Sequence, residues 1–499
     1  MRGFVMKKKI IFVLLAVGCL FCSLAGCGTA DYLEETGKKI NRYQIDCAVD
    51  AGAKKLSAIE TFTFRNDYDV TFTCLKFHLY PNAFREGAQI KPISAETEAK
   101  AYPNGKSFGS ITVESVTVDG AQVPFVVGGA DFNVLEVPLK KELYTGETVT
   151  TEITFEVQLA NVCHRLGYGK DTINCGNWYP VLCAVENNVF LTDPYYANGD
   201  PFCSEMANYE VNLRVDEKYV LAHTGDVTAT EKRESDVIYK IKADCVRDFA
   251  FVLSDKFQTL TAETDGITVR YFYFADKEPE RSLKTACDSL KTFGETIAKY
   301  PYRQLSVVET DFCYGGMEYP NLIYITSGLD ADFYQQVIVH ETAHQWWYGL
   351  VGNNEVKHAW MDEGLTEFST AYFYFKNPSY NVSYPMMMLK CEKTYTTYVS
   401  ISNAFDRKTD TSMQRAVWEY PSETEYVVMT YNKGMLMFDQ LREVMGSSFE
   451  KGLKTYFEEN KCKIAKPEDM IASFERAFGG NLEEWFAAWL NGSVVIGEK

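Results

Sequence analysis

The sequence lacks an excess of positive charge. Its 50 Lys and Arg residues are outnumbered by 68 Asp and Glu residues, and the formal net charge is −18. Nucleic acids are bound mainly by cationic surfaces that neutralise phosphates, so no nucleic-acid partner is expected. The acidic residues are spread along the chain and form no block, which is typical of a well-solvated surface.

Closely spaced cysteines are also missing from the main part of the chain. Of the 14 cysteines, those that follow Cys27 form no C-x-x-C pair, so zinc-ribbon spacing is absent. An exported protein could bridge some members of the group Cys163, Cys175, Cys183 and Cys203. The alternative is that most of these cysteines are free and buried as small apolar residues. The sequence therefore assigns no disulfide.

The apolar run at the N-terminus is too short for a membrane-spanning helix. Lys7, Lys8 and Lys9 precede the uncharged segment 10–25, which is shorter than the roughly 20 residues a spanning helix needs. The run ends in Leu24-Ala25-Gly26-Cys27, which resembles a bacterial lipobox. We therefore expect a lipoprotein signal peptide at 1–26 and a lipid anchor on Cys27, with a tether over 27–40. The protein would then sit on the outer side of the bacterial cell membrane; an ordinary secretory signal is the alternative.

The chain is long enough for two domains, because single cores stop growing at roughly 250–300 residues. Segment 41–257 alternates apolar and polar residues in short runs bounded by Gly, Asp and Asn, as in 58–64, 149–155 and 209–215. This pattern predicts an antiparallel β-sandwich or saddle-like sheet.

From 258 onward the pattern changes to that of a mixed α/β domain, predicted over 258–499. An amphipathic helix is expected at 280–298, and strands at 305–309 and 322–326. Asp330 and Gly349 are suited to cap a helix over 331–348. One stripe of that helix is expected to face the core; it consists of Phe333, Val337, His340, His344 and Trp347. The rest of the chain is mostly helical by period, so the predicted fold class is α+β.

His340 and His344 lie one helical turn apart in the sequence His-Glu-Thr-Ala-His, and Glu363 follows after 18 residues. Two imidazoles on one helix face and a carboxylate from a later segment supply three zinc ligands. Three protein ligands leave the fourth position for water, which is typical of a catalytic zinc site. Glu341 is placed beside that position and can act as a general base. We expect one zinc ion per chain.

This pattern resembles the zinc aminopeptidases related to aminopeptidase N and the leukotriene hydrolases. Gly315-Gly316-Met317-Glu318 resembles the family's Gly-x-Met-Glu-Asn strand, and Tyr431-Asn432-Lys433-Gly434 resembles its Tyr-x-Lys-Gly segment. The resemblance implies a thermolysin-like catalytic domain after the β-rich domain. It implies that Glu318 holds the free α-amino group of a peptide substrate and that the Tyr431 hydroxyl stabilises the oxyanion. Glu367 could hydrogen-bond a ligand imidazole.

One position departs from the family pattern, since Tyr319 stands where the family has Asn. A hydroxyl cannot replace an amide at the same reach, so exopeptidase and endopeptidase activity both stay open. Another hydrolase activity on the same site, and a catalytically silent surface binding protein, are the remaining alternatives. The family's second amine-binding residue has no clear counterpart in segment 174–180.

Overall fold

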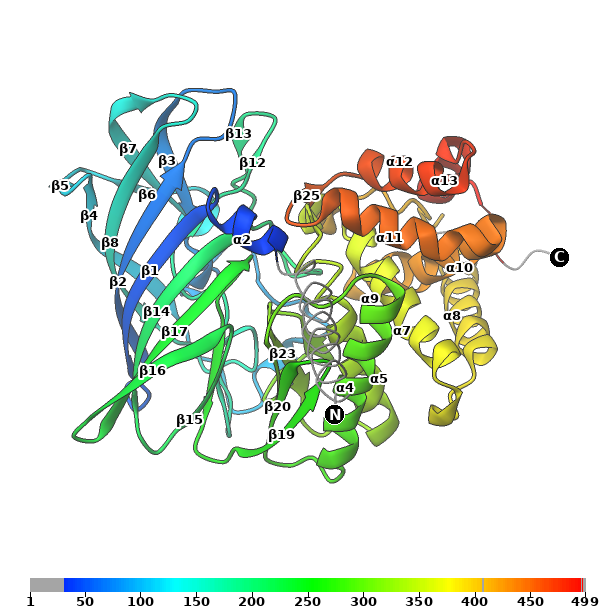
Figure 1. The fold of residues 1–499 in the computed structure, drawn as a ribbon, viewed down its shortest axis with the longest axis horizontal. Helices are drawn as coiled ribbons and strands as arrows, with labels where there is room; N and C mark the ends of the chain where they lie inside the picture. The colour runs from blue at the N-terminus through cyan, green and yellow to red at the C-terminus, as the bar shows by residue number, and fades with distance from the viewer. Residues whose placement is uncertain (1–30, 406–407, 495, 497–499) are drawn as a thin grey trace, which may run out of the picture.

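The computed structural model describes residues 31–405, 408–494 and 496, which form a β-rich part followed by a mixed and then helical part (Figure 1). The predicted signal peptide 1–26 and Cys27 lie outside the described residues. Residues 31–37 of the predicted tether form helix α2 (Asp31–Gly37). This helix is docked on the β-rich part, because Asn208 Nδ2 donates to Gly37 O over 2.7 Å.

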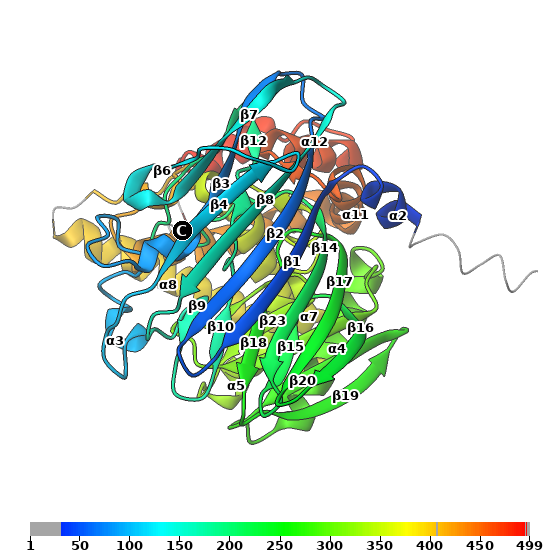
Figure 2. The ribbon, with the colours of Figure 1, turned by 90° about the vertical axis from the view of Figure 1, so that its left-hand side faces the viewer.

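The β-rich part is built on an eight-stranded sheet with the order β16-β17-β14-β1-β2-β8-β4-β5 (Figure 2). Two four-stranded sheets, β15-β18-β10-β9 and β11-β3-β7-β6, and the hairpin β12-β13 complete it. The strands are β1 (Asn41–Asp50), β2 (Lys55–Arg65), β3 (Phe72–His78), β4 (Ser110–Val118), β5 (Ala121–Gln122), β6 (Val126–Gly128), β7 (Val134–Leu143), β8 (Thr148–Gln158), β9 (Leu166–Tyr168), β10 (Ile173–Cys175), β11 (Val181–Leu182), β12 (Val185–Glu186), β13 (Val189–Phe190), β14 (Ala207–Asp216), β15 (Val220–His223), β16 (Asp226–Arg233), β17 (Asp236–Val246) and β18 (Phe251–Ser254).

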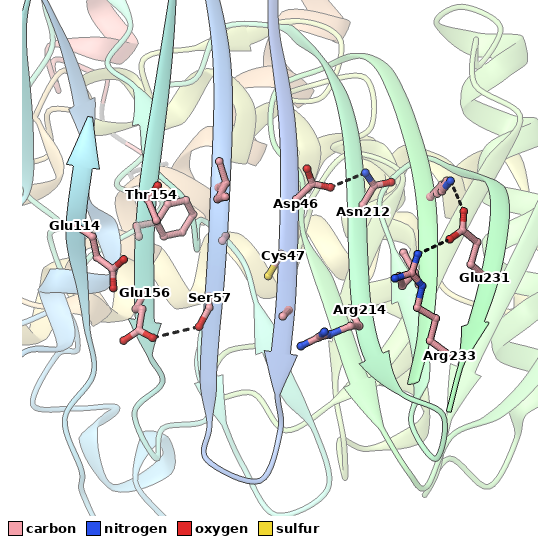
Figure 3. A pocket seen from close by; sticks show the side chains of 16 residues that line it. Asp46, Cys47, Ser57, Glu114, Thr154, Glu156, Asn212, Arg214, Glu231 and Arg233 are labelled. Carbon is pink, nitrogen blue, oxygen red and sulfur yellow. Dashed lines mark hydrogen bonds and ion pairs between the residues drawn. The ribbon is translucent and has the colours of Figure 1, made fainter. Parts of the chain in front are cut away.

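Alternation along β1 explains the two faces of the large sheet. Tyr43, Ile45 and Cys47 are buried, whereas the residues between them are exposed. The outer face is polar, and Figure 3 shows pairs that bond across strands, such as Asn212 Nδ2 donating to Asp46 Oδ1 over 2.7 Å. The sheet is not purely antiparallel as predicted, because β1 and β14 pair in parallel.

The second part begins with a five-stranded sheet of order β19-β20-β21-β23-β22. Its strands are β19 (Gln258–Thr264), β20 (Ile267–Tyr273), β21 (Gln304–Thr310), β22 (Gly316–Met317) and β23 (Leu322–Thr326), and β24 (Gly352–Asn353) pairs with β25 (Ile464–Ala465) elsewhere. The remaining helices are α3 (Glu98–Ala101) in the β-rich part and then α4 (Pro279–Thr296), α5 (Ala331–Ala343), α6 (Glu355–His358), α7 (Leu365–Lys376), α8 (Tyr384–Ala404), α9 (Glu423–Val427), α10 (Gly434–Met445), α11 (Phe449–Asn460), α12 (Pro467–Phe478) and α13 (Glu483–Leu490). The predicted α+β class, the two strands and the helix near 280–298 are confirmed.

The five-stranded sheet contributes to both of the large hydrophobic cores among the described residues. On β23, Leu322 and Tyr324 pack into the core of the β-rich part, while Ile323 and Ile325 pack into the core beneath the helices. Successive residues of a strand point to opposite faces, so one strand contributes to both cores. Strand β22 pairs with β23, so the segment that follows β22 lies at the junction of the two parts.

Helix α5 is shorter than its sequence pattern predicts. Asp330 caps its start as expected, with its side chain accepting from the backbone of Asp332 and Phe333. The helix ends at Ala343 rather than near 348, with His344 as its C-cap, and the later Tyr348 has a φ of 124° that no helix accommodates. Phe333 does not face the core either, since 49% of its side-chain surface is exposed.

Two π-helical segments, Trp360–Gly364 and Val428–Lys433, cross where two glycines meet. A Cβ atom on Gly434 would lie 2.7 Å from the Cα of Gly364. Such a distance is below van der Waals contact, so the crossing requires glycine at both positions. Glu363 and Tyr431, one on each segment, are thereby brought face to face.

Among the described residues, no helix combines the length and the apolar character that a bilayer crossing requires.

The glycine crossing gives the first testable prediction. Replacing Gly434 by Ala forces the two segments apart and should cost about 1–3 kcal/mol of unfolding free energy. The matched control is Gly294→Ala in α4, where a Cβ meets nothing within 4 Å, and this change should be neutral or stabilising. Thermal unfolding of both variants measures the difference; equal melting temperatures would show that the glycine contact is dispensable.

Candidate active site

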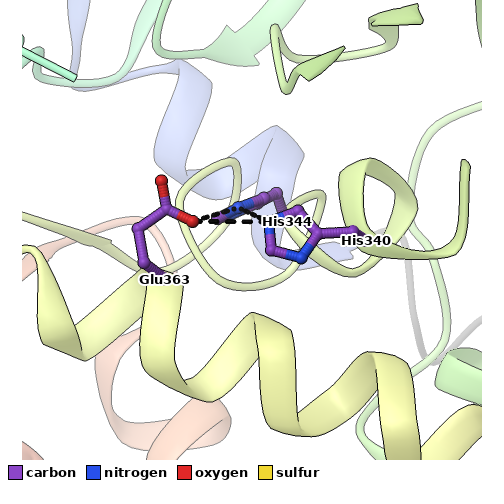
Figure 4. Close-up of side chains that lie close together, drawn as sticks. All are labelled: His340, His344 and Glu363. Atoms are coloured by element: carbon purple, nitrogen blue, oxygen red, sulfur yellow. Dashed lines mark hydrogen bonds and ion pairs between the residues drawn. The ribbon is translucent and has the colours of Figure 1, made fainter. Parts of the chain in front are cut away.

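The structure brings His340, His344 and Glu363 to one point (Figure 4). The two Nε2 atoms are 3.2 Å apart. Oε2 of Glu363 lies 3.3 Å from the Nε2 of His340 and 3.2 Å from that of His344. Ligand atoms about 2.0–2.1 Å from a tetrahedral zinc ion are about 3.3 Å apart, so this triangle fits zinc.

Neighbouring groups orient both imidazoles for this task. His340 Nδ1 lies 3.0 Å from Glu367 Oε2, and His344 Nδ1 lies 2.8 Å from the carbonyl oxygen of Trp347. Nδ1–H donates to these oxygens, which leaves each Nε2 as the lone-pair donor toward the ion. The structure therefore places Glu367 where the sequence suggested, against a ligand imidazole.

Glu341 is 4% exposed and lies beside the triangle, with a carboxylate oxygen within 4.8 Å of donor atoms of His344 and Glu318. Burial raises the pKa of Glu341 to about 7; Glu363 adds to the rise and both imidazoles oppose it. A carboxylate with a pKa near neutrality is well suited to accept a proton from water. Gly316 allows this placement, because a Cβ there would lie 2.4 Å from Glu341 Oε1.

Tyr431 closes another side of the site. Its hydroxyl donates to Glu363 Oε1, and its ring stacks on His340 with the centroids 5.9 Å apart. Burial and the Glu363 carboxylate raise the pKa of Tyr431, so the hydroxyl stays protonated and remains a donor. A protonated phenol here can stabilise negative charge that develops on a bound carbonyl oxygen.

Glu318 follows directly after Gly316 and Met317 of edge strand β22 and is 3% exposed. Burial raises the pKa of Glu318, and the nearby Asp200 raises it further. Its Oε1 is buried and has no hydrogen-bond partner among the described residues. Gln345 fixes the segment, since its Nε2 donates to the carbonyl oxygens of Glu318 and Tyr319. A buried carboxylate without a hydrogen-bond partner is costly to keep charged, so Glu318 is suited to bind a cationic group of a ligand.

Asp200 is a site residue that the sequence reasoning missed. It comes from a loop of the β-rich part, and its carboxylate lies within 4.8 Å of those of Glu318 and Glu355. Arg165 holds it in a buried ion pair and also donates to the carbonyl oxygen of Gly199 over 3.2 Å. Asp200 lies 118 residues before Glu318 in no recognisable motif, so only the fold reveals this pair of acids.

Tyr319 does not enter the cleft, although the family's Asn at this position is expected to do so. It is fully buried, and its hydroxyl donates to Asn177 Oδ1 over 2.8 Å. A Cβ on Gly176 would lie 1.9 Å from the Tyr319 hydroxyl oxygen. The Tyr319 side chain therefore fills the space next to Gly176. Gly176 belongs to segment 174–180, in which the sequence showed no clear counterpart of the family's second amine-binding residue.

These groups line one cleft of about 780 Å³ between the two parts of the protein. Gly315, Phe333, Val337, Gly199 and Tyr426 are among the other residues that line it. The acidic lining residues are Asp200, Glu318, Glu341, Glu363, Glu367 and Glu423, against the two cations Lys100 and Arg165. The cleft is therefore suited to a ligand with positive charge.

Comparisons with known proteins agree with this geometry. Residues 281–489 match the model of the peptidase family M1 domain. Aminopeptidase N of Lactobacillus delbrueckii subsp. lactis is 24% identical over 420 residues, covering 76% of this chain and 46% of that protein. Aminopeptidase N of Lactobacillus helveticus is 23% identical, with the same shares covered. The chain thus spans about half the length of these curated relatives.

A mutant M1 zinc metallopeptidase from Deinococcus radiodurans, solved with a Tyr-Ser-Ala substrate, has a similar fold. It superposes with a TM-score of 0.65 at 15% identity, over 92% of this chain and 95% of that one. Residues 281–489 thus match a peptidase family M1 domain, and the chain is similar to aminopeptidase N proteins in sequence and to an M1 zinc metallopeptidase in fold.

Proposed function

We propose that this protein is a zinc-dependent aminopeptidase that removes N-terminal residues from peptides. The observation that carries the proposal is the position of Glu318 and Asp200 beside the zinc-binding triangle. A free α-ammonium group bound by these carboxylates would place the first peptide bond next to Glu341. The aminopeptidase N relatives and the Tyr-Ser-Ala substrate of the similar structure support the same reading.

His340, His344 and Glu363 would hold the zinc ion, which supplies Lewis acidity toward a water molecule and the scissile carbonyl. Glu341 takes the proton of the attacking water and returns it to the leaving amine. Tyr431 donates a hydrogen bond to the carbonyl oxygen as negative charge develops on it. Edge strand β22 orients the peptide backbone, because Gly315, Gly316 and Met317 leave its edge open for pairing.

Exopeptidase activity is favoured over the endopeptidase alternative by the amine site. An endopeptidase substrate presents a neutral peptide group at this position, which would leave the buried Glu318 carboxylate without a counter-charge, whereas Asp200 keeps its ion pair with Arg165. Tyr319 does not weaken the case, because its side chain packs away from the cleft. A silent binding protein is disfavoured, since every donor and the general base are present.

Zinc content tests the donor set. His344→Ala and Glu363→Gln should lose stoichiometric zinc, because each removes one of three ligands. Glu341→Gln should keep zinc, and Glu367→Gln should weaken zinc affinity about 10–100-fold by freeing the His340 ring. Metal analysis after dialysis against graded chelators measures all four; full zinc retention by Glu363→Gln would refute the ligand assignment.

Hydrolysis of amino-acid amides with a free amine, compared with hydrolysis of the same amides after N-acetylation, tests whether the enzyme is an aminopeptidase. The free amides should be hydrolysed with a kcat/KM roughly 10²–10⁴-fold higher, because acetylation removes the charge that Glu318 and Asp200 bind. Glu318→Gln should raise KM for free amides, and Glu341→Gln should lower kcat about 10²–10⁴-fold. Equal hydrolysis of acetylated substrates would identify an endopeptidase instead.

We also propose that the protein is anchored to the outer side of the bacterial cell membrane by a lipid on Cys27. The basic residues, the apolar run and the lipobox-like end of that run support this location. Helix α2 begins at Asp31, only a few residues beyond Cys27, and is docked on the body of the protein. A lipid on Cys27 would therefore hold the body close to the membrane surface.

Detergent partitioning tests the anchor. The wild-type protein expressed in a bacterial host should enter the detergent-rich phase of Triton X-114, because an acyl chain adds about 0.8 kcal/mol of membrane affinity per buried CH₂. Cys27→Ala should move it to the aqueous phase without changing amide hydrolysis. Aqueous partitioning of both forms would exclude the lipid.

A further inference from the structure

Phe333 is an aromatic side chain that the fold leaves open to the cleft. It lies in the first turn of α5, is 49% exposed, and lines the cleft that contains the zinc-binding triangle. Val337, one turn further along the helix, and Leu329, just before the helix, line the same cleft. Single apolar side chains are common on protein surfaces, but three of them in one cleft beside catalytic groups form a surface that a ligand can cover.

Helical spacing sets the distance of these side chains from the zinc-binding triangle. Phe333, Val337 and His340 follow one another at i, i+4 and i+7 on α5, so they share one face of the helix. The Cα of Phe333 lies roughly 10 Å along the helix axis from that of His340, and the Cα of Val337 roughly 5 Å. One residue of an extended peptide spans about 3.3 Å. The side chain of the residue that follows the scissile bond therefore comes within reach of both apolar groups.

Close contacts between the β22 segment and α5 set the order in which a substrate meets these groups. A Cβ on Gly316 would lie 2.4 Å from Glu341 Oε1, and a Cβ on Gly315 would lie 3.6 Å from Val337 Cγ2. A peptide that runs along this segment away from Glu318 therefore passes Glu341 first and Val337 next. With its amine at Glu318 and its first peptide bond at Glu341, the substrate places its second residue beside Val337.

We propose that the preferred peptides carry a large apolar residue, such as leucine or phenylalanine, in their second position, and that Phe333 and Val337 bind its side chain. This inference rests on the proposed aminopeptidase function and names the substrate class of that site. A large apolar side chain placed against Phe333 removes both its own surface and the exposed ring from water. Glycine or alanine in the second position would leave the ring exposed, so such peptides gain less on binding.

Two dipeptide amides with the same N-terminal residue test the preference. The wild type should cleave Ala-Leu-amide with a kcat/KM at least about tenfold above that of Ala-Ala-amide, because the leucine side chain buries three further carbon atoms. Phe333→Ala should reduce this ratio to less than about threefold, mainly by raising KM for Ala-Leu-amide. Loss of the intact dipeptide amide is measured, and the ratio is taken within each variant, so a defect common to both substrates cancels.

Phe108→Ala is the matched control. Phe108 is 45% exposed, close to the value for Phe333, but it lies in the β-rich part and is not among the residues that line the cleft. This variant should change the Leu-to-Ala ratio by less than about twofold, because it loses the same side chain elsewhere. Phe333→Leu keeps an apolar side chain in the cleft, so it should retain a ratio above about fivefold.

Binding provides a readout that does not depend on turnover. Calorimetry with zinc-loaded Glu341→Gln should show Ala-Leu-amide binding about tenfold more tightly than Ala-Ala-amide, and Phe333→Ala in that background should remove most of the difference. Cleavage of both amides without preference overturns this inference alone, as does a preference that survives Phe333→Ala. Failure of the wild type to cleave either amide refutes the aminopeptidase proposal, and this inference with it.

Discussion

The triangle of two imidazole nitrogens and one carboxylate oxygen is the constraint on which the rest of this structure depends. Three Lewis bases within 3.3 Å of one another repel unless a cation lies between them. Each base is therefore fixed by a further interaction: His340 by Glu367, His344 by the Trp347 carbonyl and Glu363 by Tyr431. The two π-helical segments and the glycine contact between them also fix Glu363, because they set its distance from the Tyr431 hydroxyl.

The sequence predicted the site where local spacing decides geometry. A one-turn separation puts His340 and His344 on one face whatever surrounds the helix, and β21 and β23 follow from short apolar runs. The end of α5 was missed because the residues after it are held by tertiary contacts, such as the bond from Gln345 to the Glu318 carbonyl, that helical periodicity does not encode. Phe333 was placed in the core because periodicity cannot distinguish a helix face that lines a cleft from one that is packed.

The two acids that lie beside Glu318 could not be predicted in this way. Asp200 and Glu355 meet Glu318 from a loop and a four-residue helix, each far from it in sequence. No period or motif marks them, and an isolated acid in a sequence is most often a surface residue. Their role depends on burial, which is a property of the assembled fold. The position of Tyr319 could not be predicted either. Its side chain is larger than the family's Asn and fits only because Gly176, in the β-rich part, has no side chain.

The amine site is consequently a property of the junction rather than of either part alone. Arg247 of the β-rich part is 1% exposed and donates to the carbonyl oxygens of Tyr348 over 2.7 Å and Lys463 over 2.6 Å in the second part. A guanidinium buried among backbone carbonyls is strongly bound to them, since breaking these bonds would leave it unpaired. The junction is thus fixed before substrate arrives, so the carboxylates of Asp200 and Glu318 are preorganised. Preorganised charges would bind the α-ammonium group of the proposed substrate without an added cost of closure.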